Sequence, residues 1–260
     1  MIALLPARVV FQVYSSRFRT LPEADITGIL GRHPIPLGHV EVESVHRDEW
    51  TARLEKKDSR LVLPRPRDFM PTLAFEDYAR IRRALRVYRI EAVEVEPEDL
   101  GYLRAAMLIA GEIAALTDGL IVDVAAWKTM TAVQVADQID RAFHPMHHIS
   151  LHVDVDSWSH YWIHTHGMTK FRHPDFEIHG VPVEAVDVAL QLLNNLASVV
   201  VSGGRFLAGE HTQLCGFEFS FGHCAQERAG HFPEGALRLA QFELLEETTC
   251  PGRQALAACA

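Results

Sequence analysis

The sequence of 260 residues contains little cysteine. Its four cysteines form no CxxC pair, which argues against a zinc ribbon, and their spacing does not suggest a disulfide framework. We expect reduced thiols with mostly structural roles, because free cysteine usually behaves as a small buried apolar residue. The four residues are Cys215, Cys224, Cys250 and Cys259.

The sequence also lacks an apolar run long enough to cross a bilayer. Its most apolar segment, 105–116, is too short and is interrupted by Glu112. The first residues, MIALLPARVVFQV, carry no basic region and no small-residue cleavage site, so we interpret them as a first strand and not as a signal peptide. These features predict a cytoplasmic protein without a membrane partner.

An excess of basic residues is missing as well. The formal net charge is −9, which disfavours binding to nucleic acid or to an anionic membrane as the main role. Hydrophobic residues make up 48% of the chain and charged residues 23%, as in ordinary soluble globular proteins. A chain of this length can bury a sizeable core, either as one large domain or as two modest ones.

The common catalytic motifs are absent. The sequence has no GxSxG and no HExxH motif, and its glycines, including Gly203 and Gly204, lack the spacing of a phosphate-binding loop. His223 and Cys224 are adjacent in sequence, which does not aim the imidazole at the thiol. Nucleophilic catalysis and nucleotide binding are therefore not predicted.

Histidine is concentrated in one stretch, 144–178, which holds eight of the fifteen histidines. Within it, apolar and polar residues alternate in two runs on either side of a short polar break at 157–159. This period of two predicts a β-hairpin with one apolar face. The apolar sets face each other only in an even register, which sets Asp156 opposite His160, Asp154 opposite Trp162, His152 opposite His164 and Ser150 opposite His166.

This hairpin would bring possible metal ligands together. His164 and His166 share a face of the second strand, and the predicted register places His152 across from them with Asp154 beside it. Three imidazoles and a carboxylate suit a zinc-type or iron-type ion, the one cofactor that the sequence suggests. The alternative is a polar or packing role for these histidines, because motif matches of this kind are often accidental. Both interpretations stay open.

A basic segment interrupts the acidic chain. Residues 53–89 contain eleven Lys or Arg against five acids. We predict a helix over 75–89, in which Arg82, Arg86 and Arg89 form one stripe. This stripe is either a docking face for an acidic protein partner or an ordinary solvated helix face.

Three carboxylates occupy positions that are catalytic in some proteins and structural in others. Asp123 lies at the end of the apolar run 120–124, where a cap or turn role is the commoner one. Asp175 and Glu177 alternate on an extended segment and form a possible carboxylate pair. We favour the interpretation that they hold a turn by accepting backbone N–H groups beside Gly and Pro.

The patterns along the chain predict an α+β fold, with a mixed or mainly antiparallel sheet and helices packed on it. The break at His144-Pro145 suggests two lobes, 1–145 and 146–247, followed by a small-residue tail at 248–260. Besides the hairpin, we expect strands at 9–14, 40–45, 91–96, 120–124, 205–208, 214–221 and 237–245, and helices at 20–31, 75–89, 97–116, 131–143 and 182–201.

One motif resembles a known family. The segment GMTKFRHPDFEI carries a Gly-Met pair, a spacer, a proline and two acidic positions around an apolar one, which are Gly167, Met168, Pro174, Asp175 and Glu177. It resembles a bacterial family of domains of unknown function, distantly like suppressor-of-fused-type domains, over roughly residues 100–215. The resemblance implies an α+β domain without assigned catalytic residues and with protein–protein roles, including toxin neutralisation. The histidines are not part of this family pattern.

The sequence therefore leads to two functional hypotheses. The first is a cytoplasmic binding or regulatory protein without catalysis, which fits the missing catalytic motifs. The second is a metal-dependent enzyme, in first place a hydrolase, centred on His152, His164 and His166. Metal analysis of protein purified without a histidine tag separates the two.

Overall fold

The computed structural model describes residues 6–17, 19–35, 38–46, 49, 74–141, 144–214, 217–223 and 236–244. The chain forms two compact units: unit 1 comprises Met1–Ser150 and Thr169–Arg172, and unit 2 comprises Leu151–Met168 and His173–Ala260. The α+β prediction is confirmed, since helices pack on an antiparallel five-stranded sheet and on a mixed six-stranded sheet. The four cysteines and the predicted tail lie outside the described residues.

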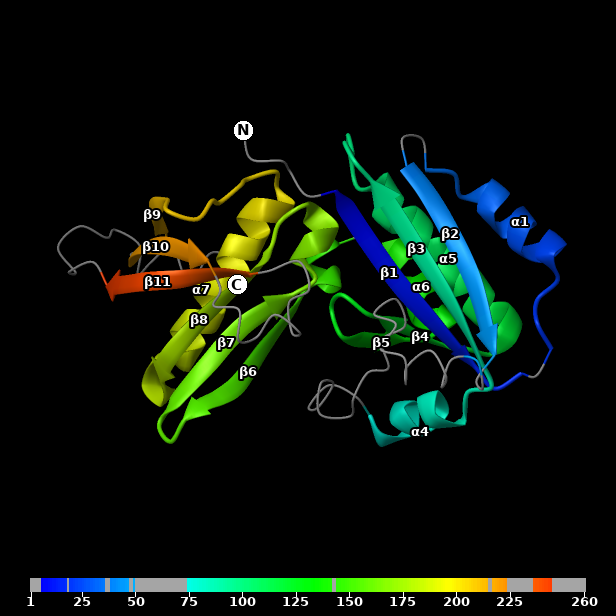
Figure 1. Ribbon diagram of the computed structural model, residues 1–260, viewed down its shortest axis with the longest axis horizontal. Coiled ribbons are helices and arrows are strands. Elements are labelled where there is room, and N and C mark those ends of the chain that lie inside the picture. The colour runs from blue at the N-terminus through cyan, green and yellow to red at the C-terminus, as the bar shows by residue number, and fades with distance from the viewer. Residues whose placement is uncertain are drawn as a thin grey trace. The chain divides into compact units, whose positions relative to one another are not determined.

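The sheet of unit 1 has the strand order β2–β3–β1–β4–β5, and every neighbouring pair is antiparallel (Figure 1). β1 lies in the middle, with Phe11 paired to Ile90 on one side and to Asp123 on the other. Its β-branched and aromatic residues suit a buried central strand. The strands are β1 Ala7–Ser15, β2 Gly38–His46, β3 Arg86–Glu94, β4 Leu120–Asp123 and β5 Lys128–Met130.

The longest described helix of unit 1, α5, packs against β1, β3 and α6. Its residues are apolar on most sides, as the sequence predicts for a buried helix, and most of them are buried. The helix ends where Asp118 adopts a left-handed conformation with φ 49°, and Gly119 N–H then donates to Ala114 O at 2.9 Å. The described helices of unit 1 include α1 Glu23–Arg32, α4 Phe75–Arg83, α5 Gly101–Thr117, α6 Ala132–Arg141 and the 3-10 helix η1 Pro145–His148.

The predicted helix over 75–89 is wrong in its second half. α4 ends at Arg83, the backbone of Ala84 is extended, and β3 begins at Arg86. Because β3 lies between β1 and β2 and pairs with both, its tertiary hydrogen bonds override the local helical pattern. The stretch 91–96 is for the same reason not an edge strand, since residues 91–94 belong to central β3.

The sheet of unit 2 has the strand order β6–β7–β8–β11–β10–β9. The predicted hairpin is confirmed as β6 and β7, which a turn at Trp158 and Ser159 connects. β8 and β11 are parallel, which makes this sheet mixed. Residues 205–208 form no strand, and the predicted strand 214–221 divides between β9 and β10. The strands are β6 Ser150–Ser157, β7 His160–His166, β8 Asp175–Pro182, β9 His211–Leu214, β10 Phe217–His223 and β11 Ala236–Leu244.

One helix, α7 (Val186–Val201), packs against β7 and β8. Together with the 3-10 helix η3 (Val183–Ala185) it is long and apolar enough to cross a membrane by length and composition alone. Its buried residues recur at helical spacing and face the core of unit 2, which is the pattern of an amphipathic core helix. They are Ala189, Leu192, Leu193, Leu196, Ala197 and Val200.

Candidate functional site

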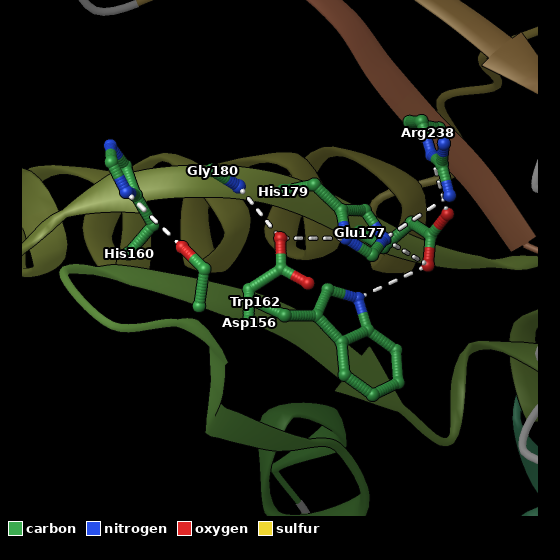
Figure 2. A network of polar contacts seen from close by, with 8 residues as sticks. Asp156, His160, Trp162, Glu177, His179, Gly180 and Arg238 are labelled. Atoms are coloured by element: carbon green, nitrogen blue, oxygen red, sulfur yellow. Dashed lines mark hydrogen bonds and ion pairs between the residues drawn. The ribbon is translucent and has the colours of Figure 1, made fainter.

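Unit 2 contains a network of polar side chains that extends over four neighbouring strands of its sheet, β6, β7, β8 and β11. Glu177 of β8 is completely buried, and its carboxylate accepts hydrogen bonds from Trp162 Nε1 at 3.1 Å and from Arg238 Nε at 2.9 Å (Figure 2). A buried carboxylate is tolerated when a cation and hydrogen-bond donors compensate for its lost hydration. Glu177 therefore joins β7, β8 and β11 through its side chain.

His179 extends this network to β6. Its Nδ1 lies 3.3 Å from the carboxylate of Asp156, which also accepts a hydrogen bond from Gly180 N–H at 3.2 Å. Arg238 Nη2 lies 3.2 Å from His179 Nε2 (Figure 2). The same Nε2 lies 3.2 Å from Glu177 Oε2, so the two ring nitrogens of His179 contact one guanidinium and two carboxylates. The network thus connects the edge strand β6 to the middle of the sheet.

Three histidines of the hairpin gather beside Trp162. The ring centroids of His152, His164 and His166 are 4.8 to 5.6 Å apart, and all three side chains are buried. Trp162 stacks on His164 with 3.8 Å between ring centroids. These contacts place the three imidazoles on one face of the hairpin, as the predicted even register requires.

The fourth predicted ligand, Asp154, lies at the border of this cluster. Its carboxylate is 3.8 Å from His164 Nε2, and its side chain is 54% exposed. Within the described residues, no group of three or more His, Cys, Asp or Glu side chains is arranged to hold a metal ion. The structure brings the predicted residues together, but as packed rings rather than as a formed set of metal ligands.

The motif residues act on the turn between β7 and β8. Gly167 has φ 108°, a conformation that glycine adopts without strain. The carboxylate of Asp175 accepts hydrogen bonds from Thr165 Oγ1 at 3.0 Å and from Met168 N–H at 3.1 Å. The turn-holding role is confirmed for Asp175, whereas Glu177 binds side chains instead.

Unit 1 contains a buried ion pair that could not be predicted from the sequence. Lys170 Nζ contacts the carboxylate of Asp123, and both side chains are buried. Lys170 Nζ also donates to His148 O at 2.9 Å, and the Tyr102 hydroxyl donates to Lys170 O. Asp123 caps the following turn by accepting from Ala126 N–H at 3.1 Å, so its predicted turn role is confirmed. Its pairing with Lys170 has no local signal in the sequence.

Two further ionisable groups surround this pair. Burial, followed by the charge of Lys170, lowers the pKa of Lys128 to about 8, and Lys128 Nζ donates to the backbone oxygens of His147 at 2.9 Å and Ile149 at 2.5 Å. Burial and the nearby charges of Lys170 and Lys128 lower the pKa of His148 from 6.5 to about 2. His148 is therefore neutral in the folded protein at any moderately acidic pH.

This neutral histidine predicts acid destabilisation of unit 1. Below pH 6.5, His148 is protonated in the unfolded chain but not in the folded chain. Its contribution to the free energy of unfolding is therefore complete above pH 6.5 and falls by about 1.4 kcal/mol for each pH unit below it. We expect His148→Gln to reduce the pH dependence of unit 1 stability by one proton between about pH 6 and pH 4. Hydrogen exchange of β1 and β4 amides at several pH values measures this, and parallel pH profiles for the two proteins would contradict it.

The three arginines of the predicted docking stripe do not share a surface. Arg82 is exposed on α4, whereas Arg86 and Arg89 belong to β3. Arg86 Nη1 donates to Ser44 Oγ at 3.0 Å, and Arg89 is buried and paired with Glu91. The predicted single helix face is wrong because the helix ends before Arg86.

A different surface stands out at an edge of the unit 2 sheet. β6 is the terminal strand of this sheet. Two of its valines are exposed, Val153 by 40% and Val155 by 74% of their surface. Trp158 at the tip of the same hairpin is fully exposed. We call these three residues and the outer side of β6 the hairpin edge.

The other edge strands of the described sheets are protected in ways that β6 is not. β5 and β9 are short, and short edges offer few free backbone groups. β2 is as long as β3, but none of its three valines is exposed. The hairpin edge therefore combines length with exposed apolar side chains.

Comparison with known proteins adds no relative. No family model matches the chain, and neither the curated proteins nor the solved structures provide a match. The resemblance to the bacterial domain family of unknown function stays a prediction.

Proposed function

We propose that this protein is a non-catalytic binding or regulatory protein that docks a partner protein along the hairpin edge. One observation carries the proposal: a long terminal strand exposes Val153, Val155 and Trp158. Neutralisation of a toxin, which the resemblance implies, is one form that such a regulatory role takes.

The physical reason lies in the backbone of an edge strand. Every second residue of β6 directs its N–H and C=O away from β7, and these groups form hydrogen bonds with an added strand. Peptides that add a strand in this way gain affinity from the main chain and specificity from alternate side chains. An exposed tryptophan at the end of the strand supplies the kind of anchor that dominates binding energy in many interfaces.

The polar groups of unit 2 support a structural rather than a catalytic role. Glu177, Asp156 and Asp175 each accept hydrogen bonds from groups within the sheet or its turn. The metal-dependent hydrolase would need a ligand set, and the described histidines and Asp154 do not form one.

Site-specific photo-cross-linking tests the docking role. A photoreactive phenylalanine analogue placed at Val155 should trap a protein partner in the cells that make this chain. Val133 on α6 is the matched control, because it is 77% exposed and lies in unit 1. We expect cross-links from position 155 and not from position 133. A second change, Trp158→Ala, should reduce them about thirtyfold, because tryptophan anchors are commonly worth about 2 kcal/mol or more.

The proposal fails on either of two results. Equal cross-linking from both positions would show that exposure alone accounts for the trapped protein. No cross-link from position 155, in cells where the chain is folded, would show that the hairpin edge has no partner there.

A further inference from the structure

We infer that the segment docked on the hairpin edge is an extended strand of the partner in which apolar and basic side chains alternate. This inference rests on the proposed function and specifies the chemistry of the partner. It follows from the two faces of β6, one of which is apolar and the other acidic.

The apolar face selects apolar residues in the added strand. Val153 and Val155 lie on the same face of β6, because side chains two residues apart in a strand point the same way. α7 packs against β7 and β8, and these two valines of β6 stay exposed. A partner strand with β-branched or aromatic residues at alternate positions would bury that surface through cross-strand contacts.

The opposite face selects basic residues. Asp154 and Asp156 alternate with the valines, and Asp154 is the more exposed of the two. The imidazole of His164 lies 3.8 Å from Asp154, and that of His179 lies 3.3 Å from Asp156. Arg238 is directed to Glu177 and His179, and the half-exposed Asp154 supplies negative charge at the edge. Opposite charges placed across a strand pair are favourable, and like charges are unfavourable.

A second copy of this chain fits the edge poorly. In an antiparallel pair of two β6 strands, every even register sets Asp154 opposite an even-numbered residue of the other copy. When the two strands pair near their middles, Asp154 or Asp156 of one copy lies close to Asp154 or Asp156 of the other. The net charge of −9 adds long-range repulsion between the copies.

Three dye-labelled synthetic peptides of equal length test the inference by fluorescence anisotropy. The first alternates Val and Lys, the second alternates Val and Glu, and the third has the composition of the first with its valines and lysines in two blocks. We expect the alternating Lys peptide to bind about tenfold more tightly than the other two. The Glu peptide places like charges opposite Asp154 and Asp156, and the block peptide cannot place its valines and lysines on opposite faces of the strand. Added salt should reduce this difference.

Two variants connect the binding to the edge. Asp154→Lys should reverse the preference between the Lys and Glu peptides, because it reverses the more exposed charge. Val155→Lys should weaken binding of the Lys peptide, whereas the matched control Val133→Lys should leave it unchanged. Sedimentation of the wild-type chain measures self-association, and a dimer that Val155→Lys dissociates would overturn the inference in favour of a second copy.

The failure of this inference and that of the proposed function give different results. Equal binding of the three peptides, or binding of none, overturns the basic alternating strand. Cross-linking from position 155 in that case still supports docking at the hairpin edge by a partner of other chemistry. Absence of both cross-linking and peptide binding overturns the two together.

Discussion

Replacing Lys170 with methionine should destabilise unit 1 by about 3–5 kcal/mol, because the change leaves the carboxylate of Asp123 buried without its cation. The backbone oxygen of His148 loses the Lys170 donor as well. Hydrogen exchange in the amides of β1 and β4 reports on unit 1 and separates it from unit 2. We expect these amides to exchange faster at neutral pH, with smaller changes in β7 and β8.

A double variant supplies the control for this experiment. Lys170→Met combined with Asp123→Leu removes both charges, and replacing a whole buried pair by apolar residues is often close to neutral. The double variant should keep a loss of about 1 kcal/mol, since Ala126 N–H no longer has Asp123 as its acceptor. If the single variant were as stable as the wild type, the ion pair would have no part in holding unit 1.

The second large effect is expected at Glu177. Glu177→Leu should destabilise unit 2 by about 2–3 kcal/mol, because Trp162 Nε1 and Arg238 lose their shared acceptor in a buried position. The guanidinium of Arg238 is partly exposed, which keeps the expected loss below that of a fully buried charge. Exchange of the β7 and β8 amides measures this change.

Two substitutions bracket the role of Glu177. Glu184→Leu on exposed η3 should change stability by less than about 0.5 kcal/mol, as exposed substitutions usually do. Glu177→Gln keeps an acceptor for Trp162 but removes the charge that pairs with Arg238, so its effect should lie between the two. Equal effects of the Leu substitutions at positions 177 and 184 would contradict the structural role of the network.

Local patterns in the sequence were sufficient to predict some elements. The hairpin follows from strict alternation, and the buried helix α5 follows from apolar residues on most of its sides. The end of α4 could not be placed, because Arg82, Arg86 and Arg89 recur at a spacing that suits a helix. The two neighbours of β3 in the sheet decide its conformation, and that pairing is not visible in a single segment.

The same distinction holds for the site. Histidines that alternate on a hairpin predict a shared face, and the structure places His152, His164 and His166 together. Arg238 could not be predicted as a partner of Glu177. The two residues meet because β11 pairs in parallel with β8, and this pairing joins strands that are far apart in the sequence. Lys170 lies in a segment that belongs to unit 1 while its sequence neighbours belong to unit 2, so nothing local indicates its contact with Asp123.

The most direct test of docking at the hairpin edge is hydrogen exchange of the β6 amides in the presence of the alternating Lys peptide. If the peptide docks at the hairpin edge, exchange slows at the outward-facing amides within 150–157, while the amides of the edge strands β2 and β9 exchange as before. Binding of the peptide with unchanged exchange in β6, or with protection at β2 or β9 instead, would contradict docking at this edge.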